Sequence, residues 1–169
     1  MSLCDHYTRV QKGGAKLPPD SPVVGLLFGL RNEFNIVIMD ATEAIYSVNA
    51  SRFPELNLLE IEKKIKLWLA VYPNFELVGW YSVGTATETY HAQLHQILSQ
   101  LNNNLVLLLI NCRLLSNLQV LYYCIFSPSF TFMNYFTLER WKCSSATSCI
   151  DLSFRTCDDQ QYSIFFCIY

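Results

Sequence analysis

The feature that most constrains the fold is an amphipathic helix that we predict between Pro54 and Pro73. Its apolar residues recur at spacings of 3, 4, 3 and 4, which places them on one helix face; they are Leu58, Ile61, Ile65, Trp68 and Tyr72. Asn57 followed by Glu60 resembles a capping box at its start. A helix with one apolar stripe buries that stripe against another element, so the pattern predicts a layered domain.

Apolar runs of strand length lie on both sides of this helix. The expected strands are residues 23–30, 34–41, 75–81 and 105–110, and a second helix is expected at residues 90–101. The first two strands are joined by a turn at residues 31–33, which predicts a hairpin. Strands and helices in this order predict an α+β fold, a mixed β-sheet flanked by helices.

The pattern changes after residue 110. Residues 1–100 hold 18 charged side chains and residues 101–169 hold only 8. Residues 118–126 and 129–138 are expected as strands, whereas residues 139–169 lack sustained periodicity and no element is predicted there. We therefore divide the chain into one domain at residues 3–138 and a divergent tail at residues 139–169. Within the domain, residues 111–138 match the pattern of the preceding residues poorly. We expect the tail to be mobile, because ordering a backbone costs about 1–2 kcal/mol per residue.

The composition excludes several classes of function. Twelve Lys and Arg against fourteen Asp and Glu give a net charge of −2, which argues against nucleic acid and anionic membranes as partners. Residues 105–126 are long enough to span a membrane, but Arg113 within them costs about 2.5–3.5 kcal/mol, so we predict no span. The seven cysteines form no C-x-x-C motif, and the N-terminus lacks the apolar stretch of a secretory signal. We therefore predict free thiols in a reducing compartment.

Two glycine motifs flank the predicted helix. The first reads Gly25-Leu26-Leu27-Phe28-Gly29 and the second reads Gly79-Trp80-Tyr81. Together, and at this spacing, they resemble the MPN domain family, over about residues 3–110 and thinly to Leu138. The resemblance implies a mixed sheet between helices, in a three-layer arrangement like that of cytidine deaminases. Residues 4–9 resemble the C-terminal half of the family's first helix, which implies that this helix is incomplete here.

Catalytic members of this family are zinc isopeptidases, and the resemblance implies where their residues would fall. Two histidines and an aspartate hold the metal, and a glutamate accepts the proton of the bound water. Carried over position by position, the glutamate falls on Pro22, the two histidines on Ser82 and Gly84 with Val83 between them, and the aspartate on His95. None of the required residues stands at its position. The resemblance therefore implies a non-catalytic member with no metal and no cofactor.

Two other patterns resemble metal sites. His91 and His95 are four residues apart on a predicted helix, but the Glu of the zinc-protease helix motif is missing, so we interpret them as a polar helix face. The six late cysteines are spaced by 12, 19, 6, 8 and 10 residues, which matches no zinc-ribbon pattern. We predict no metal site from either pattern.

Within the non-catalytic branch, residues 79–84 read Gly-Trp-Tyr-Ser-Val-Gly and most resemble subunit six of the COP nine signalosome. This implies a scaffold that pairs with the catalytic MPN subunit and other signalosome subunits, and that acts indirectly on cullin ubiquitin ligases in the cytoplasm and nucleus. A non-catalytic MPN subunit of translation initiation factor three or of the proteasome lid remains an alternative. An active metallopeptidase with divergent ligands is a third hypothesis, less favoured.

Overall fold

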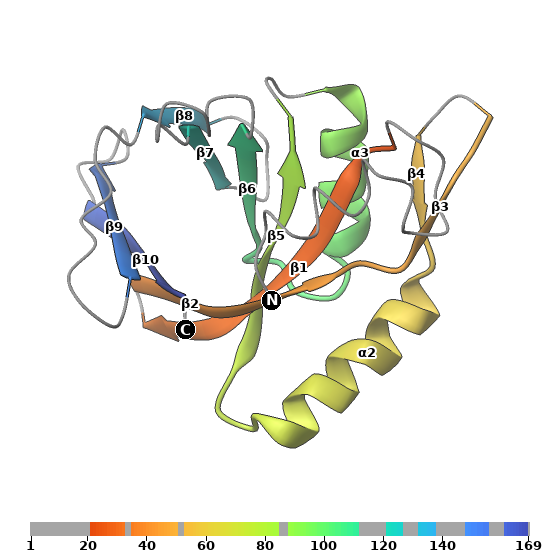
Figure 1. The fold of residues 1–169 in the computed structure, drawn as a ribbon, viewed down its shortest axis with the longest axis horizontal. Coiled ribbons are helices and arrows are strands. Elements are labelled where there is room, and N and C mark those ends of the chain that lie inside the picture. Colours follow the sequence, from red (N-terminus) through yellow and green to blue (C-terminus); the bar gives the residue numbers. More distant parts are fainter. Residues whose placement is uncertain are drawn as a thin grey trace.

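The computed structural model describes residues 21–32, 35–50, 53–84 and 88–111, and the backbone of four later strands (Figure 1). In chain order the elements are β1 (Val23–Asn32), β2 (Asn35–Glu43), β3 (Tyr46–Val48), β4 (Pro54–Leu56), α2 (Leu58–Val71), β5 (Glu76–Val83), α3 (Thr89–Leu98), β6 (Val106–Asn111), β7 (Leu121–Phe126), β8 (Phe132–Thr137), β9 (Ser148–Arg155) and β10 (Gln161–Ile168). Each strand and helix expected from the sequence within residues 23–138 is present. The family's first helix, expected at residues 4–9, lies outside the described residues.

The main sheet has eight strands in the order β8-β7-β6-β5-β1-β2-β10-β9, and β3 and β4 form a separate two-stranded sheet. β1 is antiparallel to both β2 and β5, whereas β5 is parallel to β6. The α+β fold with a mixed sheet and the expected hairpin are therefore confirmed. The turn expected at residues 31–33 is wrong in part, because Arg31 and Asn32 remain in β1 and pair with Ile36 and Asn35.

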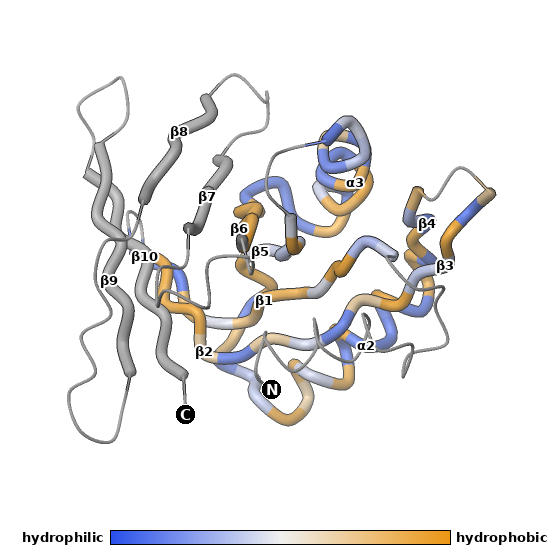
Figure 2. The backbone as a smooth tube through the Cα atoms, turned by 45° about the horizontal axis from the view of Figure 1, so that its top comes forward, coloured by the Kyte–Doolittle hydropathy of each residue, from blue (hydrophilic) through white to orange (hydrophobic). Residues whose placement is uncertain are grey.

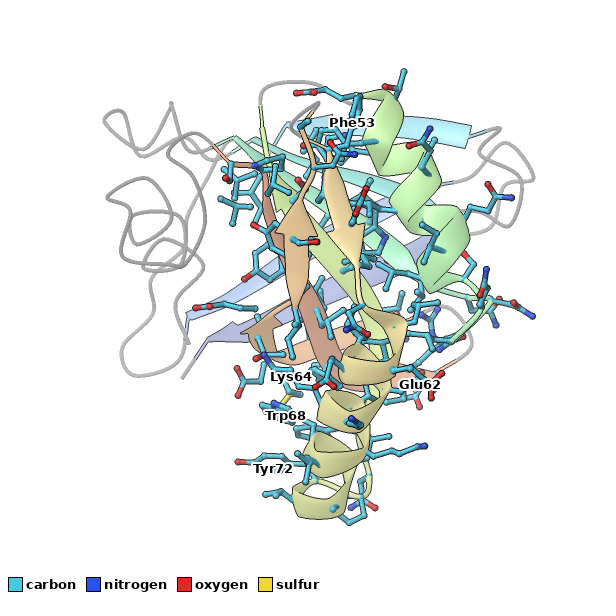
Figure 3. The ribbon with its side chains drawn as sticks, turned by 90° about the vertical axis from the view of Figure 1, so that its right-hand side faces the viewer. Phe53, Glu62, Lys64, Trp68 and Tyr72 are labelled. Atoms are coloured by element: carbon cyan, nitrogen blue, oxygen red, sulfur yellow. The ribbon has the colours of Figure 1, made fainter. Side chains whose placement is uncertain are left out.

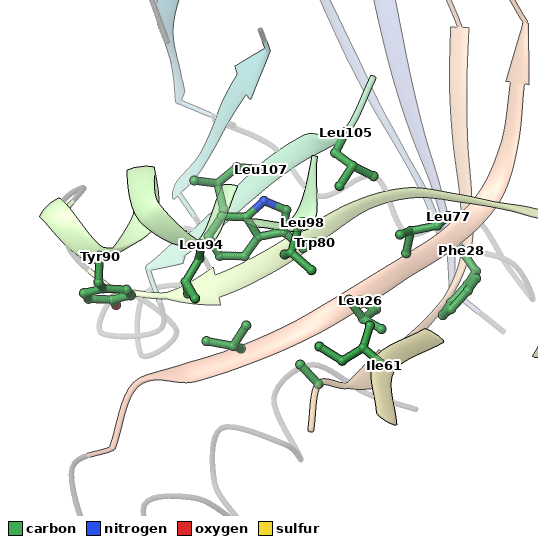
Figure 4. Packing of buried hydrophobic residues seen from close by; sticks show 12 residues of the cluster. Leu26, Phe28, Ile61, Leu77, Trp80, Tyr90, Leu94, Leu98, Leu105 and Leu107 are labelled. Carbon is green, nitrogen blue, oxygen red and sulfur yellow. The ribbon is translucent and has the colours of Figure 1, made fainter. Parts of the chain in front are cut away.

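Both described helices pack on the same face of the central strands (Figure 4). The cluster contains Val24, Leu26, Phe28, Ala44, Ile61, Leu77, Trp80, Tyr90, Leu94, Leu98, Leu105 and Leu107. Leu27 and Tyr81, which are neighbours of cluster residues along β1 and β5, are also fully buried. Both faces of the central sheet are thus covered. Each large side chain removed from water in this way stabilises the fold by about 1.5–3 kcal/mol.

The predicted apolar stripe attaches α2 to the sheet. Ile61 is fully buried, Ile65 and Trp68 pack partly against the core, and the Trp68 ring stacks on Phe28 with centroids 4.9 Å apart. The last stripe residue, Tyr72, is the C-cap of the helix and is 44% exposed. Figure 2 shows apolar positions on α2, which lies beside β1 and β2.

The helix start differs from a full capping box. The Asn57 side chain accepts a hydrogen bond from the Glu60 N–H at 3.3 Å, as expected of an N-cap. The Glu60 carboxylate, however, accepts from the Lys63 ammonium at 3.0 Å, and the Asn57 N–H donates to the Ile45 carbonyl. Asn57 therefore caps the helix, while its own N–H anchors the helix to the segment before β3.

The later strands extend the sheet at both ends. β7 and β8 fall inside the strands expected at residues 118–126 and 129–138. No element is expected from the sequence in residues 139–169, yet β9 and β10 lie there, and β10 pairs in parallel with β2. The division of the chain at residue 138 stays a prediction. Among the described residues, none belongs to a helix long and apolar enough to cross a membrane.

Candidate functional site

The two glycine motifs meet across β1 and β5. Gly25 is the register partner of Tyr81, and the Tyr81 ring occupies the place that a side chain on Gly25 would fill. Gly79 is the register partner of Val106, and a side chain there would collide with the Val106 backbone carbonyl. Both glycines are therefore required by close approach of neighbouring groups. The motifs hold β1, β5 and β6 together and so fix the position of the residues that follow Tyr81.

The same pairing brings three of the carried-over positions to one corner of the sheet. Val24 pairs with Ser82 and Val23 with Val83, so the residue before β1, Pro22, lies at the end of β5 that continues into Gly84. The Gly84 N–H donates a hydrogen bond to the Ile110 carbonyl at 2.9 Å, which ties the corner to β6. We call this region, with Ser82 at its centre, the β1–β5 corner.

Tyr90 of α3 stands next to Ser82 in this corner. The two hydroxyl oxygens are 3.5 Å apart, and both side chains are buried. Burial raises the pKa of Tyr90, the hydrogen bond to Ser82 opposes that rise, and Glu88 adds to it. Tyr90 therefore stays a neutral hydroxyl. It was not among the residues singled out from the sequence, because nothing local shows that the first turn of α3 faces Ser82.

Aromatic side chains from the β3–β4 hairpin close the corner from outside. The Tyr46 hydroxyl donates to the Pro22 carbonyl, and the Phe53 ring packs edge-on against Tyr90 with centroids 6.3 Å apart. Burial raises the pKa of Tyr46 to about 12, and the nearby Tyr90 adds to that rise. The corner is thus filled by neutral hydroxyls and aromatic rings.

His95, the fourth carried-over position, lies elsewhere. It is five residues beyond Tyr90 on α3, or about 7.5 Å along the helix axis. Its Nδ1 accepts a hydrogen bond from the Trp80 indole N–H at 3.1 Å, and its side chain is only 2% exposed. The structure therefore gathers Pro22, Ser82 and Gly84 but places His95 against Trp80.

His91 is buried as well, at 1% exposure. Its Nδ1 accepts a hydrogen bond from the Glu88 N–H at 2.8 Å, and the Glu88 side chain completes a capping box at the start of α3. The interpretation of His91 and His95 as a polar helix face is therefore wrong, because both imidazoles face the core. Burial lowers the pKa of His91 to about 4, against the opposing effect of the Glu88 backbone. Its Nε2 is buried without a hydrogen-bond partner.

These side chains do not fit a zinc ion. Zinc sites in enzymes need three His, Cys, Asp or Glu ligands around one open position. In the corner, the Ser82 hydroxyl contacts Tyr90, Gly84 offers no side chain, and Pro22 offers only a carbonyl, which accepts from Tyr46. Within the described part of the chain, no three such side chains come together as a possible metal site.

The family model described as JAB1/Mov34/MPN/PAD-1 ubiquitin protease matches residues 1–106. The chain belongs to this family. The match spans both glycine motifs and most of the main sheet's central strands, so the resemblance deduced from residues 25–29 and 79–81 is confirmed.

Curated relatives place the chain more finely. COP9 signalosome complex subunit 6a of Arabidopsis thaliana is 27% identical over 128 residues, covering 66% of this chain and 39% of the relative. Subunit 6 of Dictyostelium discoideum is 26% identical over 111 residues, covering 66% of this chain and 34% of the relative. Subunit 6 of Oryza sativa subsp. japonica is 28% identical over 123 residues. The chain is thus a distant relative of subunit 6, and it spans less than two fifths of the length of these proteins.

Proposed function

We propose that this chain is a non-catalytic MPN scaffold of the signalosome subunit 6 type. The proposed role is to pair with a catalytic MPN isopeptidase, within a complex that removes a ubiquitin-like modifier from cullins and so regulates ubiquitin ligases. The proposed locations are the cytoplasm and the nucleus. The observation that carries the proposal is the β1–β5 corner, where Pro22, Ser82 and Gly84 meet and where Tyr90 occupies the space beside Ser82.

The chemistry of the corner supports a role without catalysis. An isopeptidase of this family needs a metal-bound water and a carboxylate that accepts its proton. The corner offers instead the hydroxyls of Ser82, Tyr90 and Tyr46, and burial keeps both tyrosines protonated. Neither group can act as a general base near neutral pH, because the pKa of each lies above its ordinary value of 10.0.

A zinc and activity assay tests this part of the proposal. The purified chain is expected to hold no stoichiometric zinc and to cleave neither a modifier–cullin nor a ubiquitin isopeptide bond. Ser82→His alone is expected to restore neither property, because Gly84 and Pro22 still lack ligand and base. One zinc per chain together with chelator-sensitive hydrolysis would show that the chain is an active metallopeptidase with divergent ligands.

Co-expression tests the partner. The chain and a catalytic MPN subunit are expected to elute together on size exclusion, and affinity purification is expected to recover cullin-modifying components. Recovery of ribosomal initiation components would favour the translation initiation factor three alternative, and recovery of proteasome lid subunits would favour the lid. The similarity to signalosome subunit 6 from three organisms supports the first outcome.

The boundary near residue 138 is part of the proposal. The family match ends at residue 106, and the curated relatives cover 66% of the chain. Limited proteolysis is expected to cut first at Arg140, Lys142 or Arg155 and to leave a core that ends near residue 138. If these sites are protected as long as the core, the parallel pairing of β10 with β2 holds the tail as an integral part of the sheet.

A further inference from the structure

Two cysteines on the later strands stand directly opposite each other in the main sheet. Cys149 of β9 is the register partner of Cys167 of β10, and the two strands run antiparallel, side by side at one end of the sheet (Figure 1). Cys124 of β7, by comparison, has Leu108 and Asn134 as its register partners. Among these three cysteines, the sheet therefore pairs Cys149 with Cys167.

The alternation of the sequence agrees with this register. Residues two apart on a strand share a face, and directly opposite residues of two paired strands lie on the same face. One face consists of the apolar pairs Ile150–Phe166, Leu152–Ile164 and Phe154–Tyr162. The other face is mostly polar and holds the pairs Cys149–Cys167, Asp151–Phe165, Ser153–Ser163 and Arg155–Gln161. A slip by one residue would mix the two faces, so the pattern specifies the register that sets the cysteines opposite each other.

The backbone separation of opposite residues suits a disulfide bond. Directly opposite residues of antiparallel strands have Cα atoms about 4.5–5.5 Å apart, and disulfide bonds join Cα atoms about 4.4–6.8 Å apart. Opposite Cβ atoms are about 4.5–5.5 Å apart, so the strands must approach slightly to reach the usual separation of about 3.5–4.5 Å. β9 is the last strand in the order of the described sheet and pairs there with β10 alone, so this approach breaks no other pairing.

The pairing of β10 with β2 gives a bond at this place a structural consequence. The positions of β10 that pair with β2 run from Ser163 to Phe166, and Cys167 follows them directly. A bond between Cys149 and Cys167 closes a loop that contains all of these positions. Closing a loop removes conformational freedom from the unfolded segment, so less entropy is lost when β10 joins β2. The bond would therefore hold the end of the chain more firmly on the sheet.

We propose that Cys149 and Cys167 form a reversible redox modification site, at which a low-molecular-weight disulfide such as glutathione disulfide oxidises the two thiols to a cross-strand disulfide bond. One cysteine thiolate attacks glutathione disulfide and releases a first glutathione, and the second thiolate attacks the resulting mixed disulfide and releases the other. Two protein thiols are oxidised, one glutathione disulfide is reduced, and the two thiol protons pass to the released glutathiones. In a reducing compartment the pair stays as thiols, and it closes when the oxidant accumulates.

Counting thiols on the full chain tests the inference. The purified chain is incubated with glutathione disulfide or with dithiothreitol, and its remaining thiols are alkylated in denaturant and counted by mass spectrometry. The reduced chain is expected to be alkylated at all seven cysteines. The oxidised chain is expected to be alkylated at two fewer and to carry no glutathione at this pair. Dithiothreitol added afterwards is expected to restore the full count.

Single substitutions assign the bond to its cysteines. Cys149→Ser and Cys167→Ser are each expected to abolish the internal bond and to leave one glutathione on the remaining cysteine of the pair, because no second thiolate displaces it. Cys124→Ser is the matched control on a strand whose cysteine has no cysteine opposite it, and it is expected to keep the loss of two thiols. Cys143→Ser and Cys157→Ser, at the cysteines nearest in sequence to Cys149, are expected to keep it as well.

Trypsin gives a second readout that needs no substitution. Arg155 lies between the two cysteines in the chain, so a cut there separates Cys149 from Cys167. In the reduced chain, the fragment of residues 156–169 is expected to be released when the digest is denatured. In the oxidised chain, this release is expected to be lost until dithiothreitol is added, because the bond joins the two pieces.

Each of the following results would overturn the inference: an unchanged thiol count after glutathione disulfide, a loss of two thiols in Cys149→Ser equal to that in the wild type, or a covalent dimer joined through Cys149 or Cys167. The inference goes beyond the proposed function, because it requires neither an MPN partner nor a signalosome. The zinc assay, the co-expression test and the proteolysis at the residue 138 boundary are carried out in dithiothreitol. Failure here and failure of the proposed function are therefore distinguishable.

Discussion

The β1–β5 corner differs in almost every physical property from the outward face of α2 (Figure 3). We call the row of Leu59, Lys63, Leu67 and Val71 on that face the outer ridge. In the corner, Ser82 and Tyr90 are buried and their hydroxyls lie within hydrogen-bonding distance. On the ridge, Leu59 and Leu67 are about 70% exposed. Catalytic members of this family need an open metal site, whereas side chains fill the corresponding corner of this chain. The apolar side chains on the outward face of α2 are exposed to solvent. The two regions therefore differ in what they present: the corner holds buried, neutral hydroxyls, and the outward face of α2 presents apolar side chains to water.

The comparison is most strongly tested at Trp80, which lies two residues before Ser82 on β5 and packs in the buried cluster. It is fully buried, and its indole N–H donates to His95. Trp80→Ala is expected to lower the free energy of unfolding by about 3–5 kcal/mol, because it leaves a cavity and an unpaired imidazole nitrogen. Urea unfolding measures the loss, with Leu67→Ala on the ridge as the control. Equal losses for the two variants would contradict the contrast between corner and ridge.

The second largest effect is the pH dependence caused by His91. The folded pKa is about 4 and the ordinary value is 6.5, so below pH 6.5 the unfolded chain binds a proton that the folded chain does not. Stability is therefore complete above pH 6.5 and falls as the pH drops toward 4, by about 3 kcal/mol in total. Unfolding measured at several pH values in this window is expected to show the fall.

His91→Asn is the matched control for this titration. The asparagine oxygen can accept the Glu88 N–H in place of Nδ1, but the side chain does not titrate. The variant is expected to lose less stability than the wild type between pH 6.5 and pH 4. Identical pH profiles for the two proteins would mean that His91 is protonated in the folded state as easily as in the unfolded state.

The sequence predicted the elements with local signals and missed the contacts that depend on distant residues. The stripe from Leu58 to Trp68 repeats every three or four residues, so the helix and its buried face followed from spacing alone. The two glycine motifs predicted the family, whereas the groups that lie close to Gly25 and Gly79 were identified only in the structure.

The missed features have a common physical cause. Tyr90 reaches Ser82 only because α3 is placed over β5 by its own packing, and no local pattern encodes that placement. His91 and His95 are polar, so they were assigned to the surface, whereas the Glu88 N–H and the Trp80 indole each satisfy one nitrogen inside the fold. Similarly, β10 joins the sheet through parallel pairing with β2, which is more than a hundred residues away in the chain.

A smaller effect is expected from the hydroxyl pair of the corner. Tyr90→Phe removes one hydroxyl and keeps the ring that packs against Phe53. The loss is expected to be about 1 kcal/mol or less, because the oxygens are 3.5 Å apart, at the long end of hydrogen-bond distances. A double-mutant cycle with Ser82→Ala measures the coupling between the two hydroxyls. Strictly additive losses would show that they act independently and that the ring alone closes the corner.

The smallest effect is expected on the outer ridge itself. Leu67→Ser is expected to change the free energy of unfolding by no more than about 0.5–1 kcal/mol, because a side chain that is 71% exposed has little area to lose from the core and serine is a slightly poorer helix former. Thermal and urea unfolding measure the change. Ile61→Ser, on the buried side of the same helix, is the matched control and is expected to cost several times more, because Ile61 is fully buried. A large loss for Leu67→Ser would mean that the Leu67 side chain is already covered within the chain.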